Sequence, residues 1–143
     1  MRVKPLTSLI IEPTNTCNLR CTFCFVTEGM TRNEGFMDLG LFKKVIDDTP
    51  ELEHLCMHNW GEPLLHKEIF EMFDYAHQAG VKYIVMNTNG TLLTDKIINK
   101  IYPLVANRPY RIKIFKMELW GEITELPISS SLLKLGLLSI AWV

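Results

Sequence analysis

The sequence has no excess of charge of one sign, no low-complexity segment and no internal repeat. Its 15 Lys and Arg residues nearly balance its 16 Asp and Glu residues, which gives a formal net charge of −1. This balance speaks against nucleic acid or an anionic membrane as the main partner. Hydrophobic residues make up 48% and charged residues 22% of the 143 residues, so we expect a globular rather than a disordered chain.

The chain also lacks a hydrophobic run of the roughly 20 residues that a membrane-spanning helix needs. Its longest strongly apolar stretch, residues 132–143, contains Lys134. The N-terminus has neither the apolar length nor the cleavage pattern of a secretory signal. We therefore expect a cytoplasmic protein, in which clustered cysteines are more often metal ligands or redox groups than disulfides.

Short apolar runs alternate with amphipathic segments over most of the chain. The predicted strands are residues 6–11, which we expect to be buried, then 53–60, 82–90 and, more weakly, 111–117. The predicted helices are residues 37–50, 66–80 and 93–101. This alternation predicts right-handed βαβ units, a parallel sheet and a single domain.

Particular residues mark the ends and the buried faces of the predicted helices. Asp38 and Thr94 are expected to cap the first and third helix, and Pro103 to follow the end of the third. Gly80 stands where the second helix needs a C-terminal cap. The apolar face of the first helix is predicted as Leu39, Phe42, Val45 and Ile46, and that of the second as Ile69, Phe70, Phe73 and Ala76.

Three unusual loops follow directly after predicted strands, at residues 15–24, 59–65 and 87–91. In parallel α/β folds, binding and catalytic groups collect at the carboxyl ends of the strands. These three loops are therefore expected to meet at one edge of the sheet.

The first of these loops contains three cysteines and no fourth beside them. Cys17, Cys21 and Cys24 form a C-x-x-x-C-x-x-C pattern, and the remaining cysteine is Cys56. Clustered thiolates suit zinc, copper(I) or an iron–sulfur cluster. Structural zinc usually takes two ligand pairs, and a redox C-x-x-C leaves Cys17 unexplained. Three cysteines would fix three irons of a four-iron cluster and leave the fourth iron open to a ligand that is not protein.

The cysteine pattern and two later motifs resemble the radical S-adenosylmethionine (radical SAM) superfamily. The aromatic Phe23 just before the last cysteine is typical of the family's cysteine motif. Residues 59–66 look like its G-G-E-P motif, with Trp60 in place of the first glycine. Residues 88–90, Thr-Asn-Gly, are similar to its third-strand motif.

The resemblance implies an α/β fold, the N-terminal part of a partial (β/α)6 TIM-like barrel, here with three βα units and a fourth strand. Residues 1–118 would form this incomplete radical SAM core. Residues 119–143 carry no family motif, and we expect a truncated or frame-disrupted copy of a longer enzyme. The motifs look most like the branch that modifies peptides and proteins or builds cofactors.

The resemblance also implies the chemistry of an oxidoreductase. Cys17, Cys21 and Cys24 would hold a 4Fe–4S cluster, and S-adenosylmethionine would bind the open iron through its amino and carboxylate groups. One electron from an external flavodoxin- or ferredoxin-like donor would then release a 5′-deoxyadenosyl radical, which abstracts hydrogen from a substrate such as a peptide or protein. The cofactors supply this chemistry, and the protein supplies position and exclusion of water.

Five residues are candidates for binding S-adenosylmethionine. Glu62 would accept a hydrogen bond from the methionine ammonium, and Gly61 would let the backbone approach the ligand. Trp60 would keep a backbone role, and Phe23 would lie against the adenine or act as a hydrophobic plug. Asn89 lies in a segment that either contacts the ligand or serves only as a turn.

No catalytic residue is assigned from the sequence. Cys56 is expected to pack as a small hydrophobe, and the four histidines are expected to be ordinary surface or core residues. The alternative function is a non-catalytic iron–sulfur or zinc-binding module.

Overall fold

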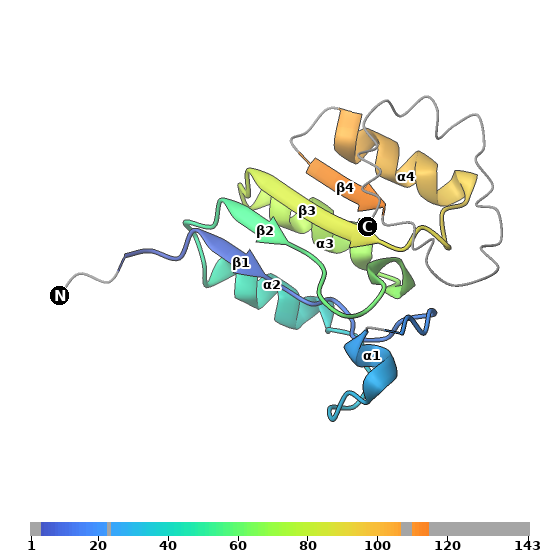
Figure 1. Cartoon of the computed structure of the whole chain (residues 1–143). Coiled ribbons are helices and arrows are strands. Elements are labelled where there is room, and N and C mark those ends of the chain that lie inside the picture. The colour runs from blue at the N-terminus through green and yellow to red at the C-terminus, as the bar shows by residue number, and fades with distance from the viewer. Residues whose placement is uncertain (1–3, 23, 107–109, 115–143) are drawn as a thin grey trace.

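The computed structural model describes residues 4–22, 24–106 and 110–114 and shows a parallel sheet of four strands in the order β1-β2-β3-β4 (Figure 1). The strands are β1 (Ser8–Ile10), β2 (His54–Cys56), β3 (Tyr83–Thr88) and β4 (Tyr110–Ile114). The helices are α1 (Phe25–Glu28), α2 (Leu39–Asp47), the 3-10 helix η1 (Pro63–Leu65), α3 (Ile69–Gln78) and α4 (Asp95–Ala106). The predicted alternation of strands and helices is confirmed.

The described ranges end before some of the predicted features. Phe23 and residues 115–143 lie outside them, and with them lie the end of the predicted fourth strand, the predicted domain boundary and the apolar stretch at residues 132–143. Among the described residues, no helix combines the length and the apolar character needed to cross a membrane.

The two faces of the sheet differ. The core face is the one that α2 and α3 cover, and we call the opposite face the inner face. Leu55 pairs with Ile84, and both are buried on the side of the sheet that α2 and α3 cover side by side (Figure 1). Cys56 pairs with Val85, and alternation turns these two residues to the opposite, inner face.

The prediction that residues 6–11 form a buried strand was right for one face only, since Ile11 is buried and Leu9 packs against the core. Ser8 is exposed and Ile10 is 71% exposed. Both residues lie on the inner face, and β1 lies at the edge of the described sheet. An apolar run does not by itself distinguish an edge strand from a central one.

The core forms where the helices pack against the sheet. Asp38 caps α2 as predicted, since its side chain accepts a hydrogen bond from the backbone N–H of Leu41 at 2.9 Å. Gly80 after α3 has a φ of 95°, which glycine adopts readily. The buried residues of α3 are Ile69, Met72, Phe73 and Ala76.

The prediction for α3 was therefore right for three positions and wrong for Phe70. Met72 takes its place on the buried face, because the spacing i, i+3, i+4, i+7 from Ile69 selects residue 72. Phe70 is only partly buried, and the ammonium of Lys100 lies 5.2 Å from its ring centre.

The helix α4 also differs from its prediction. The side chain of Thr94 accepts a 3.4 Å bond from the N–H of Ile97, as expected of a cap, but the helix continues through Pro103. Ile101 and Leu104 on either side of this proline are buried. Burying two such side chains contributes roughly 3–6 kcal/mol, which offsets the roughly 3 kcal/mol that an interior proline costs.

After β2, the chain crosses over the segment that leads into the cysteines. The backbone N–H of Glu62 donates to the carbonyl of Thr16 at 2.9 Å. A Cβ atom on Gly61 would lie 2.1 Å from the carbonyl oxygen of Thr14 and 2.8 Å from that of Thr16. Only a residue without a side chain fits at this crossing, and the crossing fixes the distance between the first two loops.

We expect Gly61→Ala to destabilise the fold, because a methyl group cannot fit against two backbone carbonyls without moving one chain segment. Overpacking of this kind costs about 1–3 kcal/mol or more in free energy of unfolding, which urea denaturation of the metal-free protein measures. Gly35→Ala is the matched control, since a Cβ atom there meets nothing within 4 Å. Equal midpoints for the two variants would contradict the crossing.

Candidate functional site

The three loops meet at the carboxyl edge of the sheet, as the sequence predicts. We call residues 15–24 the cysteine loop, residues 59–65 the second loop and residues 87–91 the third loop. The backbone of the second loop donates to Thr16, and its Glu62 carboxylate accepts the N–H of Asn89 in the third loop at 2.7 Å. The third loop reaches the cysteine loop through Asn89 Nδ2, which donates to Asn18 Oδ1 at 3.0 Å.

The Glu62 carboxylate lies at the centre of this junction. It is only 2% exposed, and Pro63 follows it in an extended backbone with φ −98° and ψ 107° at Glu62. Its Oε1 accepts from Leu64 N at 3.0 Å and Thr88 Oγ1 at 2.7 Å, and its Oε2 accepts from Asn89 N. Each carboxylate oxygen can accept two bonds, so among the described residues Oε2 keeps room for one more donor.

The charge of Glu62 is stabilised only in part. Burial raises the pKa of Glu62 above its ordinary value, while the donors Asn89 N, Leu64 N and Thr88 Oγ1 act in the opposite direction. A raised pKa means that this group's contribution to stability is present at low pH and is lost as the pH rises through the folded-state pKa. An added cation at Oε2 would relieve that loss.

The three thiols of the cysteine loop are neighbours. Cys17, Cys21 and Cys24 are all partly buried and free, and a turn joins Cys24 N to Cys21 O at 3.0 Å. Burial raises the pKa of Cys21, and the charges of Cys24 and Cys17 raise it further.

The donor set fits a cubane cluster, although its ligand geometry is not formed in the protein alone. Among the described residues, no group of three His, Cys, Asp or Glu side chains is arranged to hold a metal ion. Three adjacent soft thiols with backbone and amide N–H groups around Cys17 nevertheless match what iron–sulfur ligation requires. The assignment of the cysteines as ligands stays a prediction.

The base of the cysteine loop is closed by hydrogen bonds. Thr14 Oγ1 donates to Gly35 O at 2.7 Å, and Asn15 Oδ1 accepts from Gly35 N at 2.7 Å. Asn15 is 6% exposed and also donates to Asn33 O at 2.9 Å. Sequence reasoning missed Asn15, because an asparagine two residues before a cysteine gives no distinctive signal.

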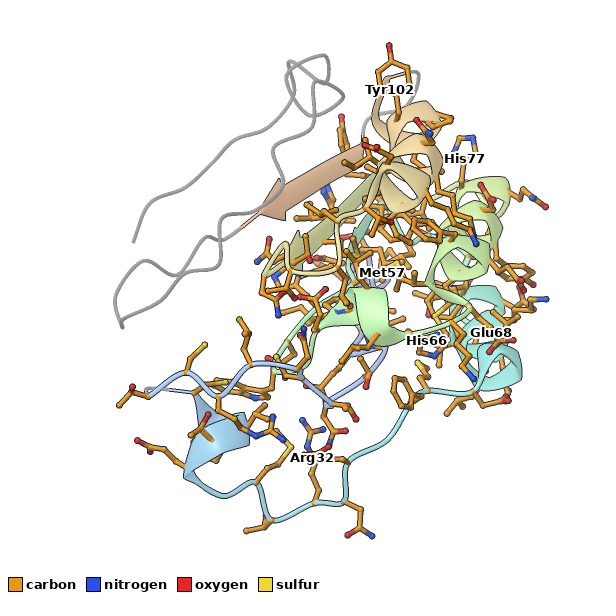
Figure 2. The ribbon with its side chains drawn as sticks, turned by 90° about the vertical axis from the view of Figure 1, so that its right-hand side faces the viewer. Arg32, Met57, His66, Glu68, His77 and Tyr102 are labelled. Carbon is orange, nitrogen blue, oxygen red and sulfur yellow. The ribbon has the colours of Figure 1, made fainter. Side chains whose placement is uncertain are left out.

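The side chain of Trp60 is partly exposed and packs on Phe25, the residue that follows the cysteine loop. The backbone N–H of Trp60 donates to Glu12 Oε1 at 3.0 Å, and Glu12 also pairs with Arg32, which Figure 2 shows on the segment after α1. The indole is 40% exposed and packs on Phe25, with ring centres 5.3 Å apart. The first glycine position of the G-G-E-P motif is therefore able to hold a tryptophan in this chain. Phe23 lies outside the described residues, so its adenine contact stays a prediction.

A polar cluster on the inner face was missed by sequence reasoning. Rather than packing only as a small hydrophobe, Cys56 has its Sγ 3.2 Å from His58 Nδ1. The N–H of Asn87 donates to His58 Nδ1 at 3.2 Å, and its side-chain amide lies 2.6 Å from His58 Nε2. Asn87 Oδ1 is buried without a hydrogen-bond partner in the described part of the chain. The i, i+2 spacing of Cys56 and His58 is visible in the sequence. That Asn87 lies beside His58 follows only from the register of β3.

The sequence of the chain is similar to a known family and to known proteins. Residues 11–110 match the model of the Radical SAM superfamily. The chain is 34% identical over 131 residues to the tungsten-containing aldehyde ferredoxin oxidoreductase cofactor-modifying protein of Pyrococcus furiosus, covering 90% of this chain and 33% of the relative. It is 33% identical over 91 residues to the AdoMet-dependent heme synthase of Methanosarcina barkeri, covering 63% of this chain and 26% of the relative. The chain thus spans a third or less of these relatives' length.

Two solved structures share the fold. The crystal structure of BtrN in complex with AdoMet and 2-DOIA superposes with a TM-score of 0.76 at 17% identity, covering 97% of this chain and 56% of that one. The structure of anSMEcpe with bound AdoMet gives 0.55 at 23% identity, covering 78% and 32%. These likenesses confirm the predicted α/β partial-barrel fold. The family match over residues 11–110 shows that the chain belongs to the radical SAM superfamily.

Proposed function

We propose that this chain binds a 4Fe–4S cluster and S-adenosylmethionine at the junction of its three loops, as part of a radical SAM enzyme. The observation that carries the proposal is the buried Glu62 carboxylate, held between the second and third loops beside the cysteine loop. When bound, the cluster and S-adenosylmethionine supply a 5′-deoxyadenosyl radical for hydrogen abstraction.

The thiols of Cys17, Cys21 and Cys24 hold the cluster in this proposal. Closure of the loop base by Thr14 and Asn15 supports it, because the backbone on both sides of the cysteines is already fixed. Metal binding then has to order only the three sulfur positions, which lowers the folding cost that is usually coupled to metal binding.

Glu62 orients S-adenosylmethionine by accepting a hydrogen bond from its ammonium group. The remaining acceptor position on Oε2 supports this role, as does the raised pKa, since a cation beside a buried carboxylate favours the ionised form. The other three donors hold the carboxylate in one orientation before the ligand arrives.

The remaining ligand contacts follow from the backbone. The N–H of Trp60 is bonded to Glu12, so a contact from Trp60 to the ligand comes from its carbonyl group. Gly61 serves the crossing of the two loops first and lets the ligand approach only as a consequence. Phe23 lies against the adenine in this proposal.

The partners follow from the chemistry. An external flavodoxin- or ferredoxin-like protein delivers the electron, and the substrate is a peptide, a protein or a cofactor precursor. The names of two relatives, a cofactor-modifying protein and a heme synthase, favour the cofactor branch.

Anaerobic reconstitution with iron and sulfide tests the cluster. We expect about four irons and four sulfides per chain and a brown protein, because three cysteines suffice to hold a cubane. Changing Cys17, Cys21 or Cys24 to Ala should abolish this iron content. Cys56→Ala is the control and should retain it, since Cys56 lies on the inner face beside His58. A colourless protein that binds zinc instead would favour the alternative of a zinc-binding module.

Calorimetric titration with S-adenosylmethionine under anaerobic conditions tests Glu62. We expect Glu62→Gln to keep the cluster and to bind the ligand ten- to hundredfold more weakly, because a charge-assisted hydrogen bond contributes roughly 1.5–3 kcal/mol. The exposed Glu51→Gln serves as control.

The pH dependence separates an electrostatic role of Glu62 from a structural one. Ligand binding favours the ionised carboxylate, so affinity in the unchanged protein should be full above the raised pKa and fall as the pH drops through it. Glu62→Gln should lack this fall. If Glu62→Gln lost iron in parallel with its affinity for S-adenosylmethionine, Glu62 would be shown to act only as a structural residue.

A further inference from the structure

The side chain of Asn89 contacts the cysteine loop, and every one of its polar groups has a partner. Its Oδ1 accepts from the backbone N–H of Thr91 at 3.0 Å and from the Thr91 hydroxyl at 2.7 Å. Its Nδ2 donates to Asn18 Oδ1 at 3.0 Å and to Cys17 Sγ at 3.8 Å. Its backbone N–H donates to Glu62 Oε2.

These partners fix which end of the amide is the nitrogen. Two donors from Thr91 converge on one end of the Asn89 amide, so that end is the oxygen. The opposite end therefore carries two N–H groups. One has Asn18 as its acceptor, and the other has the sulfur of Cys17, at a distance that the large sulfur atom allows.

The sulfur of Cys17 is thus offered N–H donors from two segments of the chain. The second donor is the backbone N–H of Leu19, 3.5 Å from Sγ. The Leu19 donor lies within the cysteine loop and comes from local turn geometry. The Asn89 donor comes from 72 residues further along the chain, and the structure brings it to the sulfur through the third loop.

We infer that Asn89 is a positioning residue that donates a hydrogen bond to the Cys17 thiolate and raises the reduction potential of the cluster. This rests on the proposed function, because it requires Cys17 to be a ligand. Reduction adds negative charge to the cluster and its sulfurs, and N–H donors at a sulfur stabilise that added charge.

A plain turn role for Asn89 explains only half of its side chain. An asparagine oxygen that accepts the N–H two residues ahead makes an Asx-turn, and aspartate makes the same turn equally well. The turn gives no reason for an amide nitrogen at this position. Asn89→Asp therefore keeps the turn acceptor and replaces the N–H donor beside Cys17 with a second, negatively charged oxygen.

Redox titration of the reconstituted full chain, followed by EPR of the reduced cluster without S-adenosylmethionine, tests the inference. We expect Asn89→Asp to lower the midpoint potential by at least about 59 mV, which is a tenfold change in the equilibrium of a one-electron couple. Asn89→Ala should lower it less, since it removes the donor without adding charge. Asn18→Ala is the matched control, because it removes the other acceptor of the same amide and leaves the donor to Cys17.

The outcomes separate this inference from the function on which it rests. Failure of the unchanged protein to assemble a cluster would overturn the proposed function and the inference together. A normal cluster with the same potential in the unchanged protein, Asn89→Asp and Asn89→Ala would overturn only the inference. An equal shift in Asn18→Ala and Asn89→Ala would assign the effect to loosening of the loop and would also overturn it.

Discussion

The junction between three loops depends on one buried carboxylate. Glu62 accepts hydrogen bonds from the second loop itself, from the Thr88 hydroxyl at the end of β3 and from the backbone of Asn89. Its own N–H donates to Thr16 at the start of the cysteine loop. A buried ionised group without partners costs several kcal/mol, so the fold keeps these loops together to satisfy it. The buried carboxylate of Glu62 thereby sets the distances between the three loops that would bind the cofactors.

The strand ends and the base of the cysteine loop are fixed before any cofactor binds, whereas the final positions of the three thiols are left to the cofactors. The core of α2, α3 and the central strands fixes the strand ends, and Thr14 and Asn15 close the base of the cysteine loop. The three thiols are close enough for the charges of Cys17 and Cys24 to raise the pKa of Cys21. With its pKa raised, the Cys21 thiol stays protonated at neutral pH in the metal-free protein, and bound iron would favour the thiolate, since cationic iron attracts a thiolate.

Local patterns were enough to predict the four strands and the three longer helices, but not the short α1 and η1. Helical spacing and Asp38 located α2, and the position of Glu62 after a strand placed it at the carboxyl edge. The failures arose where the outcome depends on what packs nearby. The exposure of Ile10 depends on β1 lying at an edge, and the continuation of α4 through Pro103 depends on the burial of its neighbours. The cluster of Cys56, His58 and Asn87 and the contact of Asn89 with Cys17 required a register and a loop path that no local pattern encodes.

The two positions that precede Glu62 differ physically, although the family motif has glycine at both. Trp60 has room because its side chain is 40% exposed and packs on Phe25. Gly61 has no room, because a Cβ atom would overlap the carbonyl oxygen of Thr14. The requirement for glycine therefore comes from the crossing of two backbones and not from the ligand alone. A motif that tolerates tryptophan at one position and no methyl group at the next is constrained by the path of the cysteine loop beneath it.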